Sequence, residues 1–396
     1  MTERAPYLTA KLQGFGTTIF AEMSALAART GAINLGQGFP DTDGPAEVSE
    51  AAIAAIRAGH NQYPPGPGIP ELRTAIAGHQ KRFYDIDLDA DSQVLVTVGA
   101  TEAIAAAILA LCDVGDEVVA FEPYYDSYAA TIAMAGAVRR PVQLRAPDYS
   151  FAPDELDAAV GPKTRFILLN TPHNPTGKVF SRAELDHIAA VAIERDLLVV
   201  TDEVYEHLVY DGEHIPISTL PGMAERTVTI SSAGKTFSFT GWKVGWVTGP
   251  AELVAAVRTA KQFLTYVCGG PFQHGIAVGL GLGDDYYRSF TVGMKAGRDR
   301  IVAGLSAAGF DVFTPAGTYF VTTDITPITG PDDADGLAFC WSLPERCGVV
   351  GVPSVVFYDD KAAGRPLVRF AFCKRPDLID EAAARLATLG TGRDSA

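Results

Sequence analysis

The sequence predicts an α/β protein with two domains: a large one built on a doubly wound, mostly parallel sheet, and a smaller α+β one. Three observations carry this prediction. Short apolar runs alternate with segments of helical spacing through the middle of the chain. From about residue 285 this alternation gives way to a long helical stretch followed by a few strands. The length of 396 residues is also more than one ordinary domain needs.

The apolar runs of the middle part are expected to be the strands of the large sheet. They are residues 94–98 (VLVTV), 117–121 (EVVAF), 165–170 (RFILLN), 197–201 (LLVVT), 227–231 (TVTIS) and 243–249 (KVGWVTG). The segments between them include two with clear helical spacing, residues 101–112 (TEAIAAAILALC) and 181–195 (SRAELDHIAAVAIER). Buried strands that alternate with helices indicate a doubly wound sheet, in which ligands bind beyond the carboxyl ends of the strands.

The C-terminal part has a different pattern. Its long helical stretch is followed by residues 309–325 (GFDVFTPAGTYFVTTDI), a further helix and residues 367–373 (LVRFAFC). This order is typical of an α+β unit. Residues 1–45 are too short for a domain of their own and are expected to complete this unit. The predicted domains are therefore 46–284 (large) and 1–45 with 285–396 (small).

The composition argues against several classes of function. The formal net charge of −15 and the pI near 4.9 disfavour nucleic acid or an anionic membrane as a partner. The five cysteines form no Cys-x-x-Cys pair and the seven histidines show no metal-ligand spacing, so we expect a reducing compartment and no metal site. The N-terminus lacks a signal-peptide core, and no apolar run reaches the ~20 residues of a membrane span. We therefore expect a cytoplasmic protein.

Residues 231–246 (SSAGKTFSFTGWKVGW) contain the end of a phosphate-binding P-loop pattern, Gly234-Lys235-Thr236. A P-loop also needs a glycine five positions before its Gly-Lys pair and a helix after it. Thr229 occupies that earlier position, inside a predicted strand, and a second predicted strand follows Lys235. The nucleotide-binding interpretation is therefore rejected.

Side chains with useful chemistry follow the ends of the predicted strands. They are Ala100 and Thr101 at a helix start, Tyr124 and Tyr125, Asn174 in a turn, Asp202 with Tyr205, and Ser232 with Lys235. Each has an ordinary alternative, because asparagine forms turns, aspartate and threonine cap helices, tyrosine packs and most lysines are solvated. Together they suit pyridoxal phosphate, which needs a lysine to hold it, an acid beside its ring nitrogen and a cradle for its phosphate. The cradle would be Ser232, Lys243 and the Ala100 and Thr101 N–H groups.

The motifs around these residues resemble those of a known family. They are NLGQGFPD, NQYPPGPGIPELR, VTVGATEA, FEPYYDSY, NTPHNPTGKV, TDEVYEHLVYDG, SSAGKTFSFTGWKVGW and LVRFAFCK, and they span residues 34–374. The sequence resembles the class I pyridoxal-phosphate-dependent aminotransferases of fold type I. The form GKTFSFTGWKVGW most resembles the subgroup of kynurenine/glutamine, methionine and N-succinyldiaminopimelate aminotransferases.

The resemblance implies roles around the cofactor ring. Lys235 would hold pyridoxal phosphate covalently, and Asp202 would keep the ring nitrogen protonated. Asn174 and Tyr205 would bond the ring hydroxyl oxygen, and Tyr125 would stack on the ring.

The resemblance also implies how phosphate and substrate are bound. Ser232 and Lys243 would bind phosphate, with Tyr63 contributed by the second subunit of a homodimer. Arg369 would clamp the substrate α-carboxylate as a bidentate fork, helped by Asn174 and the Gly38 backbone. Lys243 departs from much of the family, which has arginine there; lysine supplies the charge but not the planar fork.

The implied activity is amino-group transfer between an L-amino acid and a 2-oxo acid such as 2-oxoglutarate, by a ping-pong mechanism with the Lys235 amine as general base. The expected donor is N-succinyl-LL-2,6-diaminopimelate, of lysine and diaminopimelate biosynthesis, with kynurenine, glutamine and methionine as alternatives. A C–S β-lyase on the same scaffold would instead release pyruvate and ammonia from a cysteine conjugate. The fold also serves as the effector-sensing domain of transcription regulators. Family motifs that begin near residue 34, and the acidic charge, argue against a DNA-binding domain here.

Overall fold

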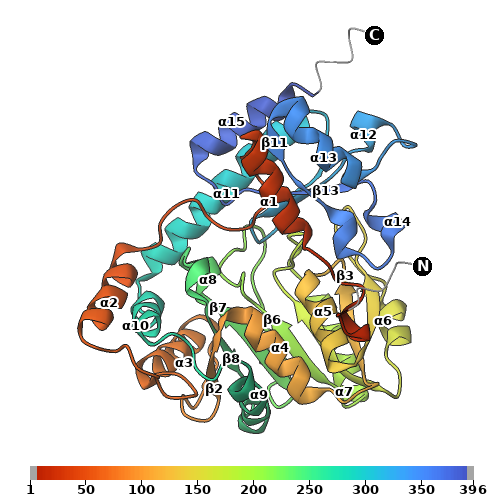
Figure 1. Ribbon diagram of the computed structural model, residues 1–396. Helices are drawn as coiled ribbons and strands as arrows, with labels where there is room; N and C mark the ends of the chain where they lie inside the picture. The colour runs from red at the N-terminus through yellow and green to blue at the C-terminus, as the bar shows by residue number, and fades with distance from the viewer. Residues whose placement is uncertain (1–6, 390–396) are drawn as a thin grey trace, which may run out of the picture.

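A seven-stranded sheet forms the centre of the larger part of the molecule (Figure 1). The structure is a computed structural model and describes residues 7–389. The strand order is β2-β8-β7-β6-β5-β3-β4, and neighbours run parallel except where β8 pairs with β2 and β7. The strands are β2 (Val94–Val98), β3 (Glu117–Glu122), β4 (Val138–Gln143), β5 (Thr164–Asn170), β6 (Leu198–Asp202), β7 (Thr227–Ser232) and β8 (Val244–Thr248). The predicted doubly wound, mostly parallel sheet is confirmed.

Strand β4 is absent from the sequence prediction. It lies at the edge of the sheet, pairs only with β3, and has the sequence VRRPVQ with most of its side chains at least partly exposed. An edge strand can hold a proline such as Pro141 and needs no apolar run, because one side of its backbone forms no ladder.

Side chains of the sheet alternate between two helical layers. Val118 packs with the layer that contains α4 (Gly99–Leu111) and α5 (Asp126–Ala135), whereas Val119 packs with the layer that contains α7 (Arg182–Glu194). Helix α7 begins at a capping box in which the side chains of Ser181 and Glu184 each accept the other's backbone N–H. Helices on both faces explain why the inner strands bury side chains on both of their faces and are mostly apolar.

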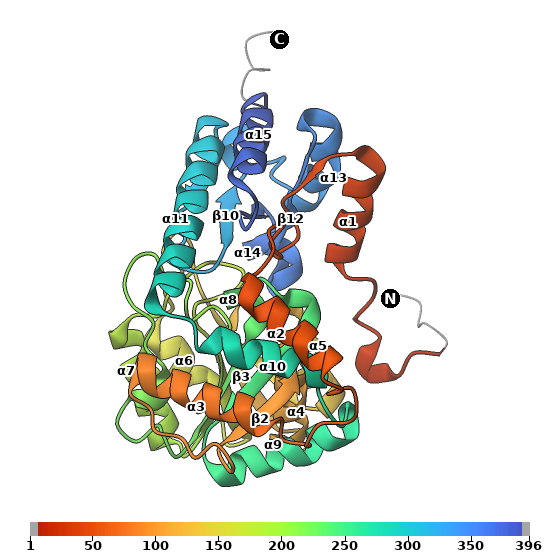
Figure 2. The same ribbon diagram turned by 90° about the vertical axis from the view of Figure 1, so that its left-hand side faces the viewer.

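Further elements complete this larger part. They are α2 (Ala46–Arg57), α3 (Pro70–Tyr84), α6 (Pro153–Ala159), η2 (Ile217–Thr219), α8 (Ala233–Thr236), η3 (Thr240–Trp242), α9 (Ala251–Leu264) and α10 (Gly270–Leu280). Figure 2 shows α2, α3 and α10 side by side near the β2 end of the sheet.

The smaller part contains an antiparallel sheet of order β12-β13-β10-β9 and a parallel pair, β1-β11. These strands are β1 (Ile33–Asn34), β9 (Asp311–Phe313), β10 (Phe320–Asp324), β11 (Val349–Val350), β12 (Val352–Pro353) and β13 (Leu367–Ala371). The helices of this part are α1 (Ile19–Thr30), α11 (Asp284–Ala307), α12 (Thr326–Thr329), α13 (Gly336–Cys347), η4 (Ser354–Phe357), α14 (Lys361–Gly364) and α15 (Pro376–Ala387). The short η1 (Ala10–Leu12) precedes them and contacts α5 of the larger part.

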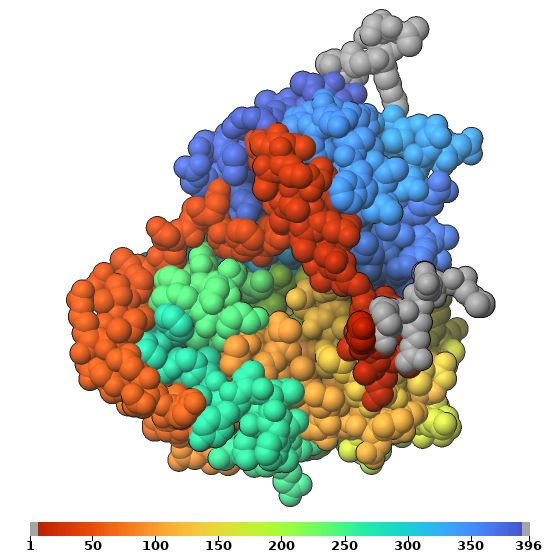
Figure 3. Space-filling view, viewed as in Figure 1, coloured from red at the N-terminus to blue at the C-terminus, as the bar shows by residue number. Residues whose placement is uncertain are grey.

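The N-terminal segment joins the two parts of the molecule. Strand β1 pairs with β11 of the smaller part, while the Lys11 ammonium near the start of the chain donates to the Met134 carbonyl oxygen on α5, at 3.1 Å. Figure 3 shows this segment in red on the front of the molecule, running from the smaller part down to the larger one. Among residues 7–389, no helix has both the length and the apolar character needed to cross a bilayer.

Candidate active site

A cavity of about 350 Å³ lies at the carboxyl ends of β5, β6 and β7, where strand β13 of the smaller part faces them. It brings together eleven of the twelve predicted site residues: Gly38, Ala100, Thr101, Tyr125, Asn174, Asp202, Tyr205, Ser232, Lys235, Lys243 and Arg369. The twelfth, Tyr63, does not line it. A site at the strand ends is the position expected for a doubly wound sheet.

Lys235 projects into this cavity from α8, a single helical turn directly after β7. Its ammonium nitrogen lies 5.9 Å from the ring centre of Tyr205 and 5.7 Å from that of Tyr319. Burial is the main cause that lowers the pKa of Lys235 to about 8, although Asp202 and Cys373 oppose the shift. A four-residue turn is not the long helix of a P-loop, and the amine is tuned toward its neutral, nucleophilic form.

This lowered pKa predicts a distinctive reactivity in protein freed of any cofactor. Only the neutral amine reacts with formaldehyde and cyanoborohydride, so methylation of Lys235 should rise with pH and level off above about 8. Exposed Lys81 is the control, because its hydrogen bonds to Asp85 and Asp87 raise its pKa and its methylation should keep rising at higher pH. Mass spectrometry of peptides after brief labelling measures both. Identical pH profiles for the two lysines would contradict the assignment.

Asp202 ends strand β6 and is almost fully buried. One carboxylate oxygen accepts a hydrogen bond from the Tyr128 hydroxyl at 2.6 Å, and the other accepts from the Val204 N–H at 3.3 Å. Burial raises the pKa of Asp202 to about 6, opposed by these two hydrogen bonds and by Lys235. The carboxylate is therefore poised to hold a proton on a neighbouring basic nitrogen.

The role of Tyr128 is not among the sequence predictions. It lies on α5, three positions after Tyr125, and the two rings stand at 90° with centres 5.7 Å apart. The signal is the third tyrosine of FEPYYDSY, which falls one helical turn after the second.

Replacing Tyr128 with phenylalanine should lower kcat by about 10-fold, because a hydrogen bond to a charged group contributes about 1.5–3 kcal/mol. The Tyr128 hydrogen bond lowers the pKa of Asp202, so its removal should also move the acidic limb of the pH–rate profile to higher pH. Tyr149→Phe, at a buried tyrosine outside the cavity, is the control. An unchanged acidic limb in Tyr128→Phe would refute the role.

Arg369 is the most unusual charge in the cavity. It lies on β13, is 1% exposed, and forms no ion pair with a carboxylate of residues 7–389. Its guanidinium donates to the Asn174 side-chain oxygen at 2.9 Å and to the Gly36 carbonyl at 3.2 Å, and it lies 3.9 Å from the ring centre of Phe320. Its Nε has no hydrogen-bond partner in the described chain, and burial lowers the pKa of Arg369 to about 10. A buried cation with free donors is prepared for an anionic ligand.

The turn after β5 positions Asn174. The Asn170 side chain donates to the Asp202 carbonyl at 2.8 Å and accepts the Asn174 N–H at 2.8 Å, so it ties this turn to the end of β6. Because the Asn174 side-chain oxygen accepts from Arg369, its amide N–H group is left for a ligand oxygen. Asn170 is a residue that the sequence interpretation missed, although it is the last residue of a predicted strand.

Ala100, Thr101, Ser232 and Lys243 also line the cavity. Helix α4 begins here, so its first backbone N–H groups face the cavity, and the Lys243 ammonium lies 3.4 Å from the Thr101 hydroxyl. A Cβ at Gly245 would lie only 2.6 Å from the Gly99 carbonyl carbon, so glycine is required for β8 to approach this helix start. The N–H groups, the hydroxyls and one ammonium together make an anion cradle.

Two predicted site residues remain to be placed, Gly38 and Tyr63. The Gly38 carbonyl accepts the Tyr319 hydroxyl at 2.6 Å, and a Cβ there would lie 2.4 Å from the Phe320 ring. Gly38 thus lets the chain pass close to the ring that stacks on Arg369. Tyr63 lies on the surface, 80% exposed, with its ring 5.4 Å from that of Tyr266.

The cavity fits the cofactor that the resemblance implies. The anion cradle suits a phosphate, the buried Asp202 carboxylate suits a protonated ring nitrogen, and the Lys235 amine suits a carbonyl carbon. The free Nε of Arg369 suits a second anion. Three cationic side chains, Lys235, Lys243 and Arg369, therefore line the cavity, against one carboxylate, Asp202. This excess of positive charge suits the binding of a dianionic phosphate and a carboxylate.

Comparisons with known proteins agree with this geometry. Residues 30–386 match the family model "Aminotransferase class I and II". The chain is 52% identical to a probable N-succinyldiaminopimelate aminotransferase of Mycobacterium tuberculosis, covering 96% of this chain and 98% of that protein. It is 38% identical to a methionine aminotransferase of Escherichia coli (98% and 100% covered) and 38% identical to the mouse kynurenine–oxoglutarate transaminase 3 (94% and 88% covered).

Solved structures give the same result for the fold. The solved structure of an N-succinyldiaminopimelate aminotransferase of M. tuberculosis superposes with a TM-score of 0.93, covering 96% of this chain and 100% of that one at 51% identity. An aspartate aminotransferase of Thermus thermophilus superposes with a TM-score of 0.88 at 31% identity, covering 96% and 99%.

Proposed function

The chain belongs to the class I and II aminotransferases, and from this premise we propose that it transfers the amino group of N-succinyl-LL-2,6-diaminopimelate to 2-oxoglutarate, with pyridoxal phosphate as cofactor. The single observation that supports this amino donor is the 52% identity, over nearly the whole chain, to a probable N-succinyldiaminopimelate aminotransferase. The methionine and kynurenine enzymes stand at 38%.

Each residue of the cavity would have its own role in this reaction. When bound, pyridoxal phosphate supplies an electron sink for the charge that develops at the substrate Cα. Asp202 would hold the proton on the ring nitrogen, with Tyr128 and the Val204 N–H fixing its carboxylate. Tyr205 and the Asn174 amide would bond the ring oxygen, and Tyr125 would lie against the ring. Ser232, Lys243 and the Ala100 and Thr101 N–H groups would hold the phosphate.

Lys235 would attach the cofactor and then move a proton. Its lowered pKa leaves a large share of the amine neutral near pH 8, as a general base at the substrate Cα must be. Arg369 would orient the substrate through its α-carboxylate, since its Nε is free and it forms no ion pair with a described carboxylate. The described residues that line the cavity include no second arginine, so Arg369 is the arginine proposed for the α-carboxylate.

A panel of amino donors tests the proposed substrate. With 2-oxoglutarate as acceptor, kcat/KM for N-succinyl-LL-2,6-diaminopimelate should exceed those for methionine, kynurenine and glutamine by at least about 10-fold. A higher value for one of the others would replace the donor and leave the aminotransferase class intact. Pyruvate and ammonia from a cysteine conjugate, without amino-group exchange, would indicate the β-lyase instead.

A homodimer is the proposed assembly, with Tyr63 reaching the phosphate of the neighbouring subunit. Four large apolar side chains are exposed together, around the loop of Tyr63 and the end of α9: Tyr63 at 80%, Phe263 at 80%, Tyr266 at 53% and Leu264 at 45%. The buried Lys261 ammonium binds the Tyr266 and Gly66 carbonyls and so holds this surface in place. An exposed apolar patch of this kind suits an interface between subunits.

Mixing two variant chains, each lacking one residue of the proposed shared site, tests this assembly. A Tyr63→Phe chain alone should bind pyridoxal phosphate roughly tenfold more weakly, because one hydrogen bond to a charged group is lost. In a heterodimer with an inactive Lys235→Ala chain, one of the two sites has neither lesion, so the mixture should recover activity at low cofactor concentration. Sedimentation that shows a fully active monomer, or a mixture no better than its parts, would refute the shared site.

Two further proposals concern the whole chain. A division into 46–284 and 1–45 with 285–396 is supported by the pairing of β1 with β11, although η1 lies against α5 of the larger part. A cytoplasmic location is supported by the five cysteines, which are free thiols.

A further inference from the structure

Three potential metal ligands meet outside the active-site cavity. His79 lies on α3, and Glu206 and His207 lie in the turn that follows β6. The Nε2 atoms of the two histidines are 2.6 Å apart, and one ligand atom of each of the three residues lies within 4.8 Å of the other two. A separation of 128 residues between the histidines explains why spacing along the chain predicted no metal site.

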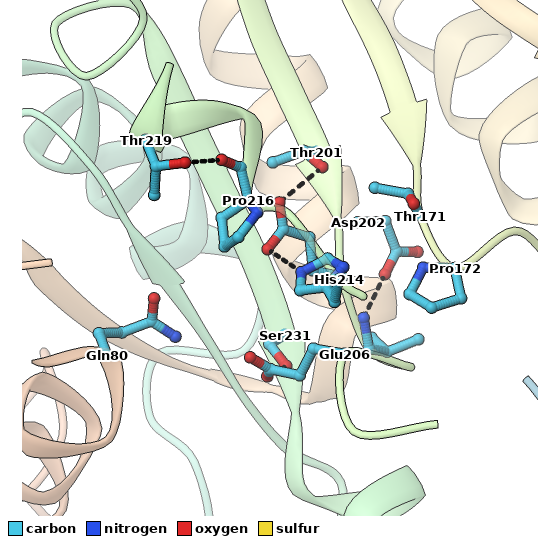
Figure 4. A network of polar contacts seen from close by, with 12 residues as sticks. Gln80, Thr171, Pro172, Thr201, Asp202, Glu206, His214, Pro216, Thr219 and Ser231 are labelled. Atoms are coloured by element: carbon cyan, nitrogen blue, oxygen red, sulfur yellow. Dashed lines mark hydrogen bonds and ion pairs between the residues drawn. The ribbon is translucent and has the colours of Figure 1, made fainter. Parts of the chain in front are cut away.

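One oxygen of the buried Glu206 carboxylate has no hydrogen-bond partner among the described residues. Glu206 is 5% exposed, and its other carboxylate oxygen accepts the Ser231 hydroxyl at 2.6 Å. Figure 4 shows the Glu206 side chain beside Ser231. The neighbouring Tyr84 is half-buried, and desolvation together with the charge of Glu206 and a hydrogen bond to it raises the pKa of Tyr84, so this tyrosine stays uncharged. A buried carboxylate oxygen without a donor is unfavourable unless a cation binds it.

Arg82, the cation near this cluster, is occupied elsewhere. Its guanidinium bonds Asp284 and the Leu282 carbonyl oxygen, and it lies over the Phe83 ring with 4.7 Å to the ring centre. The free carboxylate oxygen and the two histidine rings therefore share a space that no protein cation fills in the described chain.

We propose that His79, Glu206 and His207 bind a divalent transition-metal ion of the zinc class, with water in a fourth position. Two imidazoles and one carboxylate are a donor set that suits Zn²⁺. On a tetrahedral ion, two nitrogens at 2.0–2.1 Å from the metal stand about 3.3 Å apart, so the rings must separate by about 0.7 Å on loading. The Ser231 hydroxyl holds the carboxylate from behind, as outer-shell partners of metal ligands do.

The position of the ion gives it a structural role. It would link α3 to the turn that begins at Asp202 and contains Tyr205, and Ser231 directly precedes Ser232 of the anion cradle. A ligand that binds only the folded state stabilises that state. Zinc should therefore raise the Tm of the enzyme without entering the active-site cavity.

The experiment measures bound zinc on the holoenzyme. Protein treated with chelator, equilibrated with Zn²⁺ and gel-filtered should retain one zinc ion per chain by mass spectrometry of the metal. His79→Gln and Glu206→Gln should each weaken binding by at least about 100-fold, and neither should show the visible ligand-field spectrum of tetrahedral Co²⁺ that the parent shows. Glu206→Gln keeps the shape and the Ser231 hydrogen bond, so it answers the question even if His79→Gln folds poorly.

The control is the other histidine pair of the described chain, His60 and His274, whose ring centres lie 4.4 Å apart near the surface. The double variant His60→Gln/His274→Gln should retain the zinc and the Co²⁺ spectrum. The proposal is overturned if the parent retains no zinc, if Glu206→Gln and His79→Gln retain as much as the parent, or if only the control pair loses it.

Discussion

Replacing Lys235 with alanine is expected to abolish amino-group exchange, with kcat lowered by at least about 10⁴-fold. Two functions are lost together, since the same nitrogen is proposed to attach the cofactor and to move the proton at the substrate Cα. General acid–base catalysis alone contributes about 10²–10⁴-fold. The fold should survive, because Lys235 lies at a cavity wall and donates no hydrogen bond that α8 or β8 depends on among those described.

Borohydride treatment identifies the attachment directly. The parent protein should be yellow, lose its visible absorption on reduction and carry the label at Lys235 by peptide mass spectrometry. Lys243→Arg, which restores the residue common in the family, is the matched control and should remain active and be labelled at Lys235. A colourless Lys235→Ala variant that still exchanges amino groups would overturn the assignment.

The large sheet could be predicted from the sequence because its strands are covered on both faces. The interior of a strand such as β3, residues 118–121 (VVAF), is then apolar on both faces, and this pattern is visible without an alignment. Strand β4 has no such requirement at the sheet edge, and VRRPVQ therefore gives no strand signal.

The site could be predicted where chemistry follows directly on a strand end, as for Asp202 and Lys235. It could not be predicted where a contact depends on two elements packed by the fold. The Tyr128 hydroxyl reaches Asp202 from 74 residues away, and His79 meets His207 across 128. Such distances are set by the topology of the sheet, which local spacing does not encode. The family resemblance supplied Arg369, but only the structure shows that its guanidinium lacks an acidic partner among residues 7–389.

That missing partner decides between two interpretations of Arg369. A structural arginine on a half-buried strand would satisfy its charge with a nearby carboxylate, as Arg298 does with Asp211 and Asp299. Arg369 instead bonds a neutral amide and a carbonyl, stacks on Phe320, and leaves Nε without a partner. A buried cation in this state has lost its hydration without forming an ion pair, so a bound carboxylate would provide the missing interaction.

Arg369→Lys should therefore raise KM for every amino donor and 2-oxo acid by a similar factor, because all of them share the α-carboxylate. Lysine keeps the charge but cannot form two parallel hydrogen bonds. Loss of this fork costs about 2–4 kcal/mol, or roughly 30- to 1,000-fold in kcat/KM. Cofactor content and Tm should stay near those of the parent, whereas the control Arg298→Lys, at a buried arginine that is ion-paired, should lower Tm and leave KM unchanged. If Arg369→Lys behaves like Arg298→Lys, Arg369 is a structural residue and the carboxylate of the substrate is bound elsewhere in the cavity.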